Sequence, residues 1–238
     1  MVAEATQERT LVLVHGAWHG SWCWERLVPE LRERGWRVSM PDLPSSSGDP
    51  EAGMYADAAV LRDHLAAVDG PITVLAHSYG GMPVTEVAGT VPNVTGLIYL
   101  AAHMLDAGEA LVTPLGGAWF DADEPVIPVP DGANELMYAD VPADLADAAV
   151  ARLRPQSTRS FLEPLTRASW QQLPTAFVVC DEDAGLPKVL TETLPQKADL
   201  VRHLPTSHSP FLSRPAELAD LVGEISDALA GLPAPSPA

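Results

Sequence analysis

Apolar residues recur along this chain in short blocks separated by polar turns. Continuous apolar runs predict strands that are buried on both faces, and apolar residues spaced three and four positions apart predict helices. Strands and helices alternate in this pattern, which is typical of a parallel sheet with right-handed crossovers and helices on both faces. The predicted strands are residues 11–14, 36–40, 72–76, 97–101, 176–180 and 200–204, and the predicted helices are about 24–31, 58–68, 79–89, 186–197 and 218–229.

The alternation is interrupted between residues 105 and 173. This stretch is rich in Pro, Asp and Ala, and its clearest helical patterns lie around 144–153 and 160–170. We therefore predict a core made of residues 1–104 and 174–231, with residues 105–173 inserted as a cap, or lid, over the carboxyl edge of the sheet. The Pro-rich end, residues 232–238, is predicted to be a flexible tail.

The charge of the chain limits its partners. Lys and Arg total 14 and Asp and Glu total 32, so the formal net charge is 14 − 32 = −18. Such a surface repels nucleic acids and anionic membranes. We expect a small-molecule substrate and neither a nucleic acid nor a membrane as partner, and a homodimer is compatible with the sequence.

The two cysteines and the apolar run lengths bear on location. Cys23 and Cys180 lie far apart in the sequence without metal-ligand spacing, and we expect buried or semi-buried thiols in a reducing compartment. No apolar run reaches the length of a signal peptide or a membrane span. The expected location is cytoplasmic.

One motif carries the chemistry. The residues Ala76-His77-Ser78-Tyr79-Gly80 lie between a predicted strand and a predicted helix, and they differ from the nucleophile elbow G-x-S-x-G only at Ala76. The tight turn of an elbow strains the serine backbone and exposes its Oγ, and it requires small neighbours. A helix N-cap serine is the alternative. The strand–turn–helix context favours Ser78 as a nucleophile.

A nucleophilic serine requires a base and an acid. Of the seven histidines, His208 lies in the loop after the last predicted strand, at the same sheet edge as Ser78. The hydrolase chain order of Ser, acid and His also places the base last. The acid is expected after strand 176–180, where Asp181, Glu182 and Asp183 follow one another, and spacing does not choose among them.

Several segments together resemble a known family. They are residues 12–20 with Trp22 and Trp24, and residues 41–44, 76–81, 97–102 and 207–210. As a set they are similar to the α/β-hydrolase branch that holds plant methylesterases and hydroxynitrile lyases, with bacterial esterase relatives. The resemblance covers nearly the whole core and is weakest in the cap. It implies an α/β-hydrolase fold with about six strands.

The resemblance also implies site residues. Relatives place the acid three residues after a Cys or Trp at the strand end, which corresponds to Asp183, with Asp181 in reserve. The oxyanion hole is implied to consist of the backbone N–H groups of Ala17 and Tyr79. We expect Trp18 and His103 to line the substrate pocket. The family uses no metal and no organic cofactor.

These residues predict a serine hydrolase that cleaves a carboxylic ester, lactone or thioester of a small neutral molecule through an acyl-enzyme. An acyltransferase or cyclase using the same acyl-enzyme is the main alternative. Hydroxynitrile lyases of this branch carry Lys directly after the triad His, and here that residue is Ser209, which favours the esterase side. A non-catalytic binding protein is disfavoured because no triad member is missing.

Overall fold

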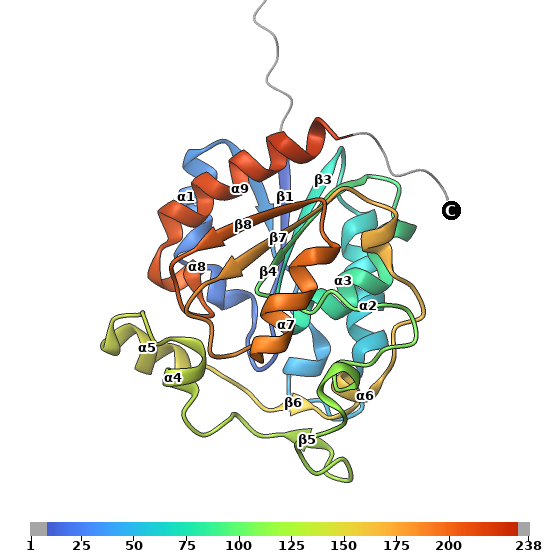
Figure 1. Ribbon diagram of the computed structural model, residues 1–238, viewed down its shortest axis with the longest axis vertical. Helices are drawn as coiled ribbons and strands as arrows, with labels where there is room; N and C mark the ends of the chain where they lie inside the picture. The colour runs from blue at the N-terminus through green and yellow to red at the C-terminus, as the bar shows by residue number, and fades with distance from the viewer. Residues whose placement is uncertain (1–8, 233–238) are drawn as a thin grey trace, which may run out of the picture.

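A six-stranded parallel sheet forms the centre of the molecule (Figure 1). The computed structural model describes residues 9–232. The strand order is β2-β1-β3-β4-β7-β8, and every neighbouring pair is parallel. The strands are β1 (Arg9–Val14), β2 (Trp36–Ser39), β3 (Ile72–His77), β4 (Val94–Leu100), β7 (Thr175–Cys180) and β8 (Leu200–Leu204).

The sheet has an apolar core on each face. In β1, Val12 and Val14 belong to one buried cluster, whereas Leu11 and Leu13 belong to the other. This division follows from the two-residue period of a strand, and it explains why the strands read as continuous apolar runs. The first cluster contains residues of α2 (Met54–Ala66), α3 (Gly81–Val87) and α7 (Lys188–Thr193), and the second contains residues of α1 (Leu27–Glu33), α8 (Pro210–Ser213) and α9 (Pro215–Ala230). The predicted α/β architecture is therefore present.

Prolines shorten two of the predicted helices. The prediction of one helix over 160–170 is wrong. Helix α6 (Arg159–Leu162) ends at Leu162, and a separate 3₁₀ turn covers Ser169–Gln171. Glu163 has an extended backbone (φ −73°, ψ 122°) and precedes Pro164, whose ring disfavours a helical conformation at the residue before it. The predicted helix over 186–197 likewise begins after Pro187 and becomes a 3₁₀ turn at Leu194–Lys197, which contains Pro195.

Residues 105–173, which we continue to call the cap, form short elements at the carboxyl end of the sheet (Figure 1). A two-stranded antiparallel ribbon, β5 with β6, joins its two halves. The cap elements are η5 (Thr113–Leu115), β5 (Val126–Ile127), α4 (Ala133–Met137), α5 (Ala143–Val150), β6 (Gln156–Ser157), α6 and η6 (Ser169–Gln171). The predicted tail, residues 232–238, lies outside the described residues except for Leu232.

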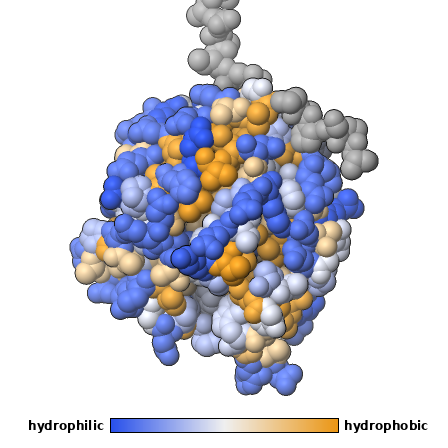
Figure 2. Space-filling model, in the orientation of Figure 1, coloured by the Kyte–Doolittle hydropathy of each residue, from blue (hydrophilic) through white to orange (hydrophobic). Residues whose placement is uncertain are grey.

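The visible surface is mostly hydrophilic (Figure 2). Figure 2 shows hydrophilic side chains over most of one face, with apolar side chains gathered in separate patches. Cys23 and Cys180 are both buried and free, as predicted. Within residues 9–232, every helix is too short or too polar to cross a membrane.

The last helix, α9, offers a test of the core. Its predicted apolar stripe is buried at Leu218, Val222, Ile225 and Leu229, while Leu221 is partly exposed. Because Ile225 is fully buried, Ile225→Ala is expected to lower the free energy of unfolding by about 2–5 kcal/mol in chemical denaturation. Val189→Ala, at a side chain that is 53% exposed, is the control, with an expected change within about 0.5 kcal/mol. Equal losses in the two variants would contradict the assignment of α9 to the core.

Candidate active site

The turn between β3 and α3 holds Ser78 in a strained conformation. Strand β3 ends at His77, a 3₁₀ turn covers Ser78–Gly80, and α3 begins at Gly81. Ser78 has φ +51°, in the left-handed region that non-glycine residues rarely adopt. Its flanking residues His77 and Tyr79 are buried, whereas Ser78 is only half-buried. The backbone therefore has the geometry of a nucleophile elbow.

Two glycines allow this turn to pack against the neighbouring strands. A Cβ atom at Gly80 would lie 2.5 Å from the carbonyl oxygen of His15, and one at Gly81 would overlap the carbonyl oxygen of His103. The backbone N–H of His103 donates to the carbonyl oxygen of Ser78 at 3.0 Å. The elbow is thus fixed between the loops that follow β1 and β4, and neither glycine position tolerates a side chain.

A buried imidazole–carboxylate pair lies at the same edge of the sheet. The Nδ1 atom of His208 is 2.9 Å from Oδ1 and 3.0 Å from Oδ2 of Asp183. The side chains of His208 and Asp183 are 5% and 1% exposed. Backbone N–H groups of Gly185 and Leu186 donate to Oδ1 of Asp183 at 2.7 and 3.1 Å.

The environment keeps the Asp183 carboxylate ionised. Burial raises its pKa, but the charge of His208, the hydrogen bond from His208 and the two backbone N–H groups together outweigh that effect, so the pKa lies below its ordinary value. The ring of His208 also packs closely on Gly185, where an added Cβ would lie 2.8 Å from Cγ of the ring. The pair is therefore tightly confined.

The three neighbouring carboxylates occupy different environments. Asp181 accepts a hydrogen bond from Nδ1 of His203 at 2.7 Å, and both side chains of that pair are about half exposed, at 47% and 61%. Glu182 is exposed. Of the three carboxylates, Asp183 is the one that contacts His208. The spacing of the residues does not predict this, because the contact depends on the local direction of the chain.

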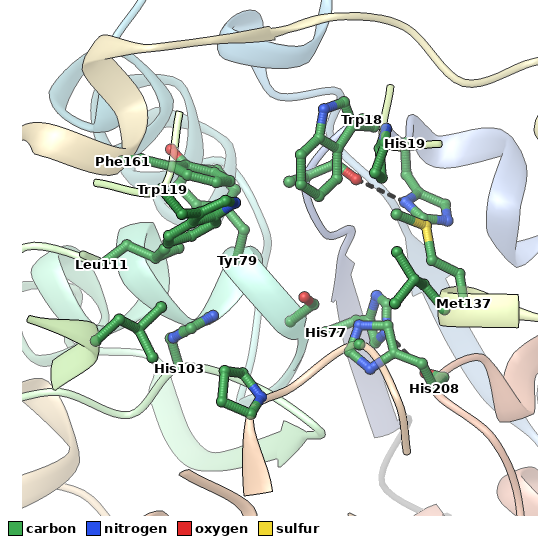
Figure 3. A pocket seen from close by; sticks show the side chains of 17 residues that line it. Trp18, His19, His77, Tyr79, His103, Leu111, Trp119, Met137, Phe161 and His208 are labelled. Carbon is green, nitrogen blue, oxygen red and sulfur yellow. Dashed lines mark hydrogen bonds between the residues drawn. The ribbon is translucent and has the colours of Figure 1, made fainter. Parts of the chain in front are cut away.

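Ser78 and His208 both line a cavity of about 340 Å³ (Figure 3). The predicted oxyanion residues Ala17 and Tyr79 and the predicted pocket residues Trp18 and His103 line it too, while Asp183 lies behind His208. Apart from histidines, no ionisable side chain other than that of Tyr79 lines the cavity within the part of the chain described. The cap supplies seven lining residues that the sequence does not predict, which are Leu111, Leu115, Trp119, Pro130, Leu136, Met137 and Phe161.

Phe161 is the centre of an aromatic wall in this cavity. Its ring centroid is 5.7 Å from that of Trp18, 5.7 Å from that of Tyr79 and 5.8 Å from that of Trp119. These rings come from the loop after β1, from the elbow and from the cap. Figure 3 shows Phe161, Trp119 and Tyr79 on the side of the cavity opposite His77 and His208. No periodic signal marks Trp119, because it lies in an irregular segment.

Four further histidines near the cavity are buried and neutral. Burial lowers the pKa of His15, of His77, of His19 to about 3 and of His103 to about 4. His77 Nε2–H donates to the backbone carbonyl of His208 at 3.0 Å, and their ring centroids are 4.6 Å apart. The ring of His103 points into the cavity from the side opposite His208 (Figure 3), and its buried Nδ1 has no hydrogen-bond partner.

Comparison with known proteins supplies the family. A family model described as the alpha/beta hydrolase family matches residues 11–221. The chain belongs to this family. The predicted α/β-hydrolase fold is confirmed.

Individual relatives agree with the family assignment. Norfluorocurarine synthase 2 from a Strychnos species is 26% identical over 263 residues, which cover 95% of this chain and 98% of the relative. Methylesterase 1 of Arabidopsis thaliana is 24% identical over 95% of this chain and 99% of its own length. A crystal structure of a pyrethroid hydrolase from Sphingobium faniae JZ-2 superposes with a TM-score of 0.76 at 28% identity, covering 94% of this chain and 99% of that one. The predicted resemblance to the branch with plant methylesterases and bacterial esterases is confirmed.

The buried histidines of this hydrolase generate a pH prediction. The pKa values of His19 (about 3) and His103 (about 4) lie below the ordinary value of 6.5, so the unfolded chain binds protons at a higher pH than the folded chain. Stability should therefore fall as the pH is lowered from about 7.5 to about 5, measured as the thermal unfolding midpoint. His103→Phe removes one such group and should lose less over this interval than wild type. Asp57, whose pKa burial raises to about 6, acts in the opposite direction and offsets part of this loss, so equal losses in wild type and His103→Phe are the result that would contradict neutral burial of His103.

Proposed function

We propose that this hydrolase cleaves a carboxylic ester of a small neutral molecule through an acyl-enzyme on Ser78, with His208 as base and Asp183 as the acid of the triad. The observation that carries the proposal is the buried His208–Asp183 pair at the wall of the cavity that the strained Ser78 also lines. A lactone or thioester presents the same reacting carbonyl and belongs to the same proposal. The names of the relatives, methylesterase and pyrethroid hydrolase, support an ester as substrate.

The reaction has two steps. In the first, His208 Nε2 takes the Ser78 hydroxyl proton while Oγ attacks the ester carbonyl, and the protonated imidazole then gives that proton to the departing alcohol. In the second, His208 deprotonates a water that attacks the acyl-enzyme, and the free acid leaves. Asp183 accepts the Nδ1–H hydrogen bond throughout and stabilises the imidazolium without being protonated itself.

The oxyanion of each tetrahedral intermediate requires donors that are already in place. Backbone N–H groups of Ala17 and Tyr79 fill this role, since both residues line the cavity beside Ser78. The Tyr79 group also lies at the start of the turn that leads into α3, where unpaired N–H groups favour negative charge. No step in this chemistry requires a metal or an organic cofactor.

The lining of the cavity favours an uncharged substrate. Its walls are aliphatic and aromatic, and its histidines other than His208 are held neutral by burial. Trp18 and His103 contact the substrate in this proposal, Trp18 through its ring face and His103 as a neutral hydrogen-bonding group. Ser209, which follows His208, is fully buried and stands where the lyases of this branch carry lysine, so cyanohydrin cleavage is disfavoured.

Removal of the nucleophile tests the proposal directly. Ser78→Ala is expected to lower the turnover of a p-nitrophenyl acyl ester by about 10⁴-fold or more, because the acyl-enzyme cannot form. A fluorophosphonate probe should label wild type and not this variant, as seen by mass spectrometry of the intact protein. Ser47→Ala, at an exposed serine, is the matched control and should label normally. A folded wild type that neither labels nor turns over esters would refute the hydrolase.

A pair of substitutions tests the acid. Asp183→Asn is expected to lower kcat by about 10⁴-fold, because an amide cannot stabilise the imidazolium and favours the wrong tautomer of His208. Asp181→Asn should stay within about twofold of wild type, because this carboxylate pairs with His203 at the surface, where ion pairs contribute little. Steady-state kinetics on one ester checks both variants, and the reverse ranking would move the acid to Asp181.

A further inference from the structure

The backbone beside the proposed oxyanion donor Ala17 is strained. Trp18, the next residue, has φ +62°, a conformation that a bulky residue keeps only when its surroundings enforce it. The carbonyl of Ala17, the N–H of Trp18 and the carbonyl of Trp18 all have hydrogen-bond partners. Each of these partners belongs to the cap or is itself bound by it.

Gln156 of β6 holds the N–H of Trp18. Its Oε1 accepts from that N–H at 3.1 Å and from Ser46 Oγ at 2.7 Å. Its Nε2 donates to Ser45 Oγ and to Ser160 Oγ, each at 2.7 Å. The side chain is fully buried, and all four hydrogen-bonding positions of its amide are used. The amide therefore has one favourable orientation, which fixes where the Trp18 N–H points.

Tyr138, just after α4, holds the carbonyl of Ala17 through His19. The Tyr138 hydroxyl donates to Nε2 of His19 at 2.7 Å, and His19 Nδ1 lies 2.7 Å from the Ala17 carbonyl oxygen (the dashed line in Figure 3). Burial lowers the pKa of His19 to about 3, so the ring is neutral and carries a single N–H. Because the Ala17 carbonyl can only accept, that proton is on Nδ1, and Nε2 therefore accepts from the Tyr138 hydroxyl.

Two more contacts complete this set. The backbone N–H of Arg154 donates to the Trp18 carbonyl at 2.9 Å. Ser45 Oγ and the Tyr79 hydroxyl donate to the same oxygen of Asp57, each at 2.5 Å. Since Gln156 binds Ser45, this buried network also reaches the second proposed oxyanion residue, Tyr79.

We propose that the cap assembles the oxyanion hole, with Gln156 and Tyr138 as positioning residues. They hold the Ala17–Trp18 peptide and thereby fix the backbone of Ala17, so that the Ala17 N–H, in the preceding Gly16–Ala17 peptide, is aimed at the reacting carbonyl. This inference rests on the proposed serine hydrolase chemistry. It gives the cap a role in the chemical step in addition to covering the cavity. An N–H that is misplaced by a fraction of an ångström stabilises the oxyanion less while the substrate still binds.

Two variants with matched controls test it. Tyr138→Phe removes one hydroxyl, and Gln156→Met removes the amide at similar volume. Tyr55→Phe removes another phenol hydroxyl that joins core to cap, the one bound to the Pro164 carbonyl, and Ser157→Ala removes a hydroxyl on β6 bound to the Pro50 carbonyl. Within residues 9–232, the hydroxyl of each control residue hydrogen-bonds to the carbonyl named and not to Ala17, Trp18 or their partners.

Kinetics and an inhibitor separate positioning from general structure. Tyr138→Phe and Gln156→Met are expected to lower kcat on a p-nitrophenyl ester by about 10- to 100-fold with KM within about twofold. The inhibition constant of a trifluoromethyl ketone, whose serine adduct places an oxyanion in the hole, should rise by the same factor as kcat/KM falls. Gln156→Glu keeps an acceptor for the Trp18 N–H and should retain more activity than Gln156→Met. Both controls should match wild type.

The outcomes distinguish this inference from the function on which it rests. If wild type is active and labels with fluorophosphonate, but both variants match their controls or change KM alone, the cap does not position the hole and the inference is wrong. If wild type itself is inert towards ester and probe, the hydrolase proposal fails first. If the thermal midpoint of Gln156→Met collapses, the conservative Tyr138→Phe decides the question.

Discussion

The left-handed backbone at Ser78 is the constraint on which the arrangement of the site depends. An isolated turn would relax from this conformation, so the surrounding structure must hold it. The holding comes from close approach: the turn passes so near the loops after β1 and β4 that Gly80 and Gly81 have no room for a Cβ atom. The parallel sheet brings these loops to one edge, and the same edge receives His208 and Asp183 from the last two strands. The geometry of the site therefore depends on the topology of the sheet.

Few charged side chains lie in the interior of the site, although the chain carries a formal net charge of −18. The Asp183 carboxylate is paired with the imidazole of His208, and the other histidines that line the cavity are kept neutral by burial. Asp57 is a second buried carboxyl, and burial raises its pKa to about 6 against the hydrogen bonds from Ser45 and Tyr79. A cavity with few fixed charges gives strong weight to each hydrogen-bond donor that faces a developing oxyanion.

The sequence predicted the parts of this molecule that are governed by local rules. The strands were visible because both faces of a parallel strand are buried, and Ser78 and His208 were visible because motif and chain order place them at one sheet edge. The choice of Asp183 by geometry depends on how the loop directs the N–H groups of Gly185 and Leu186, which spacing does not encode. The helix predicted over 160–170 was wrong because Pro164 breaks it.

The roles of Gln156 and Tyr138 could not be predicted from the sequence, for a different reason. Each is a single polar residue in an irregular segment, and its partner lies far away in the sequence. Gln156 is separated from Ser45 by 111 positions, and Tyr138 is separated from His19 by 119 positions. This separation has a consequence for exchanging parts between relatives. The cap is inserted at one place in the chain and resembles a detachable module, yet its buried hydrogen bonds end on Ser45, Ser46 and the loop at 17–19 of the core. A chimera that carried a foreign cap onto this core would lose those hydrogen bonds. The cap residues and the core residues that they bind would have to be exchanged together.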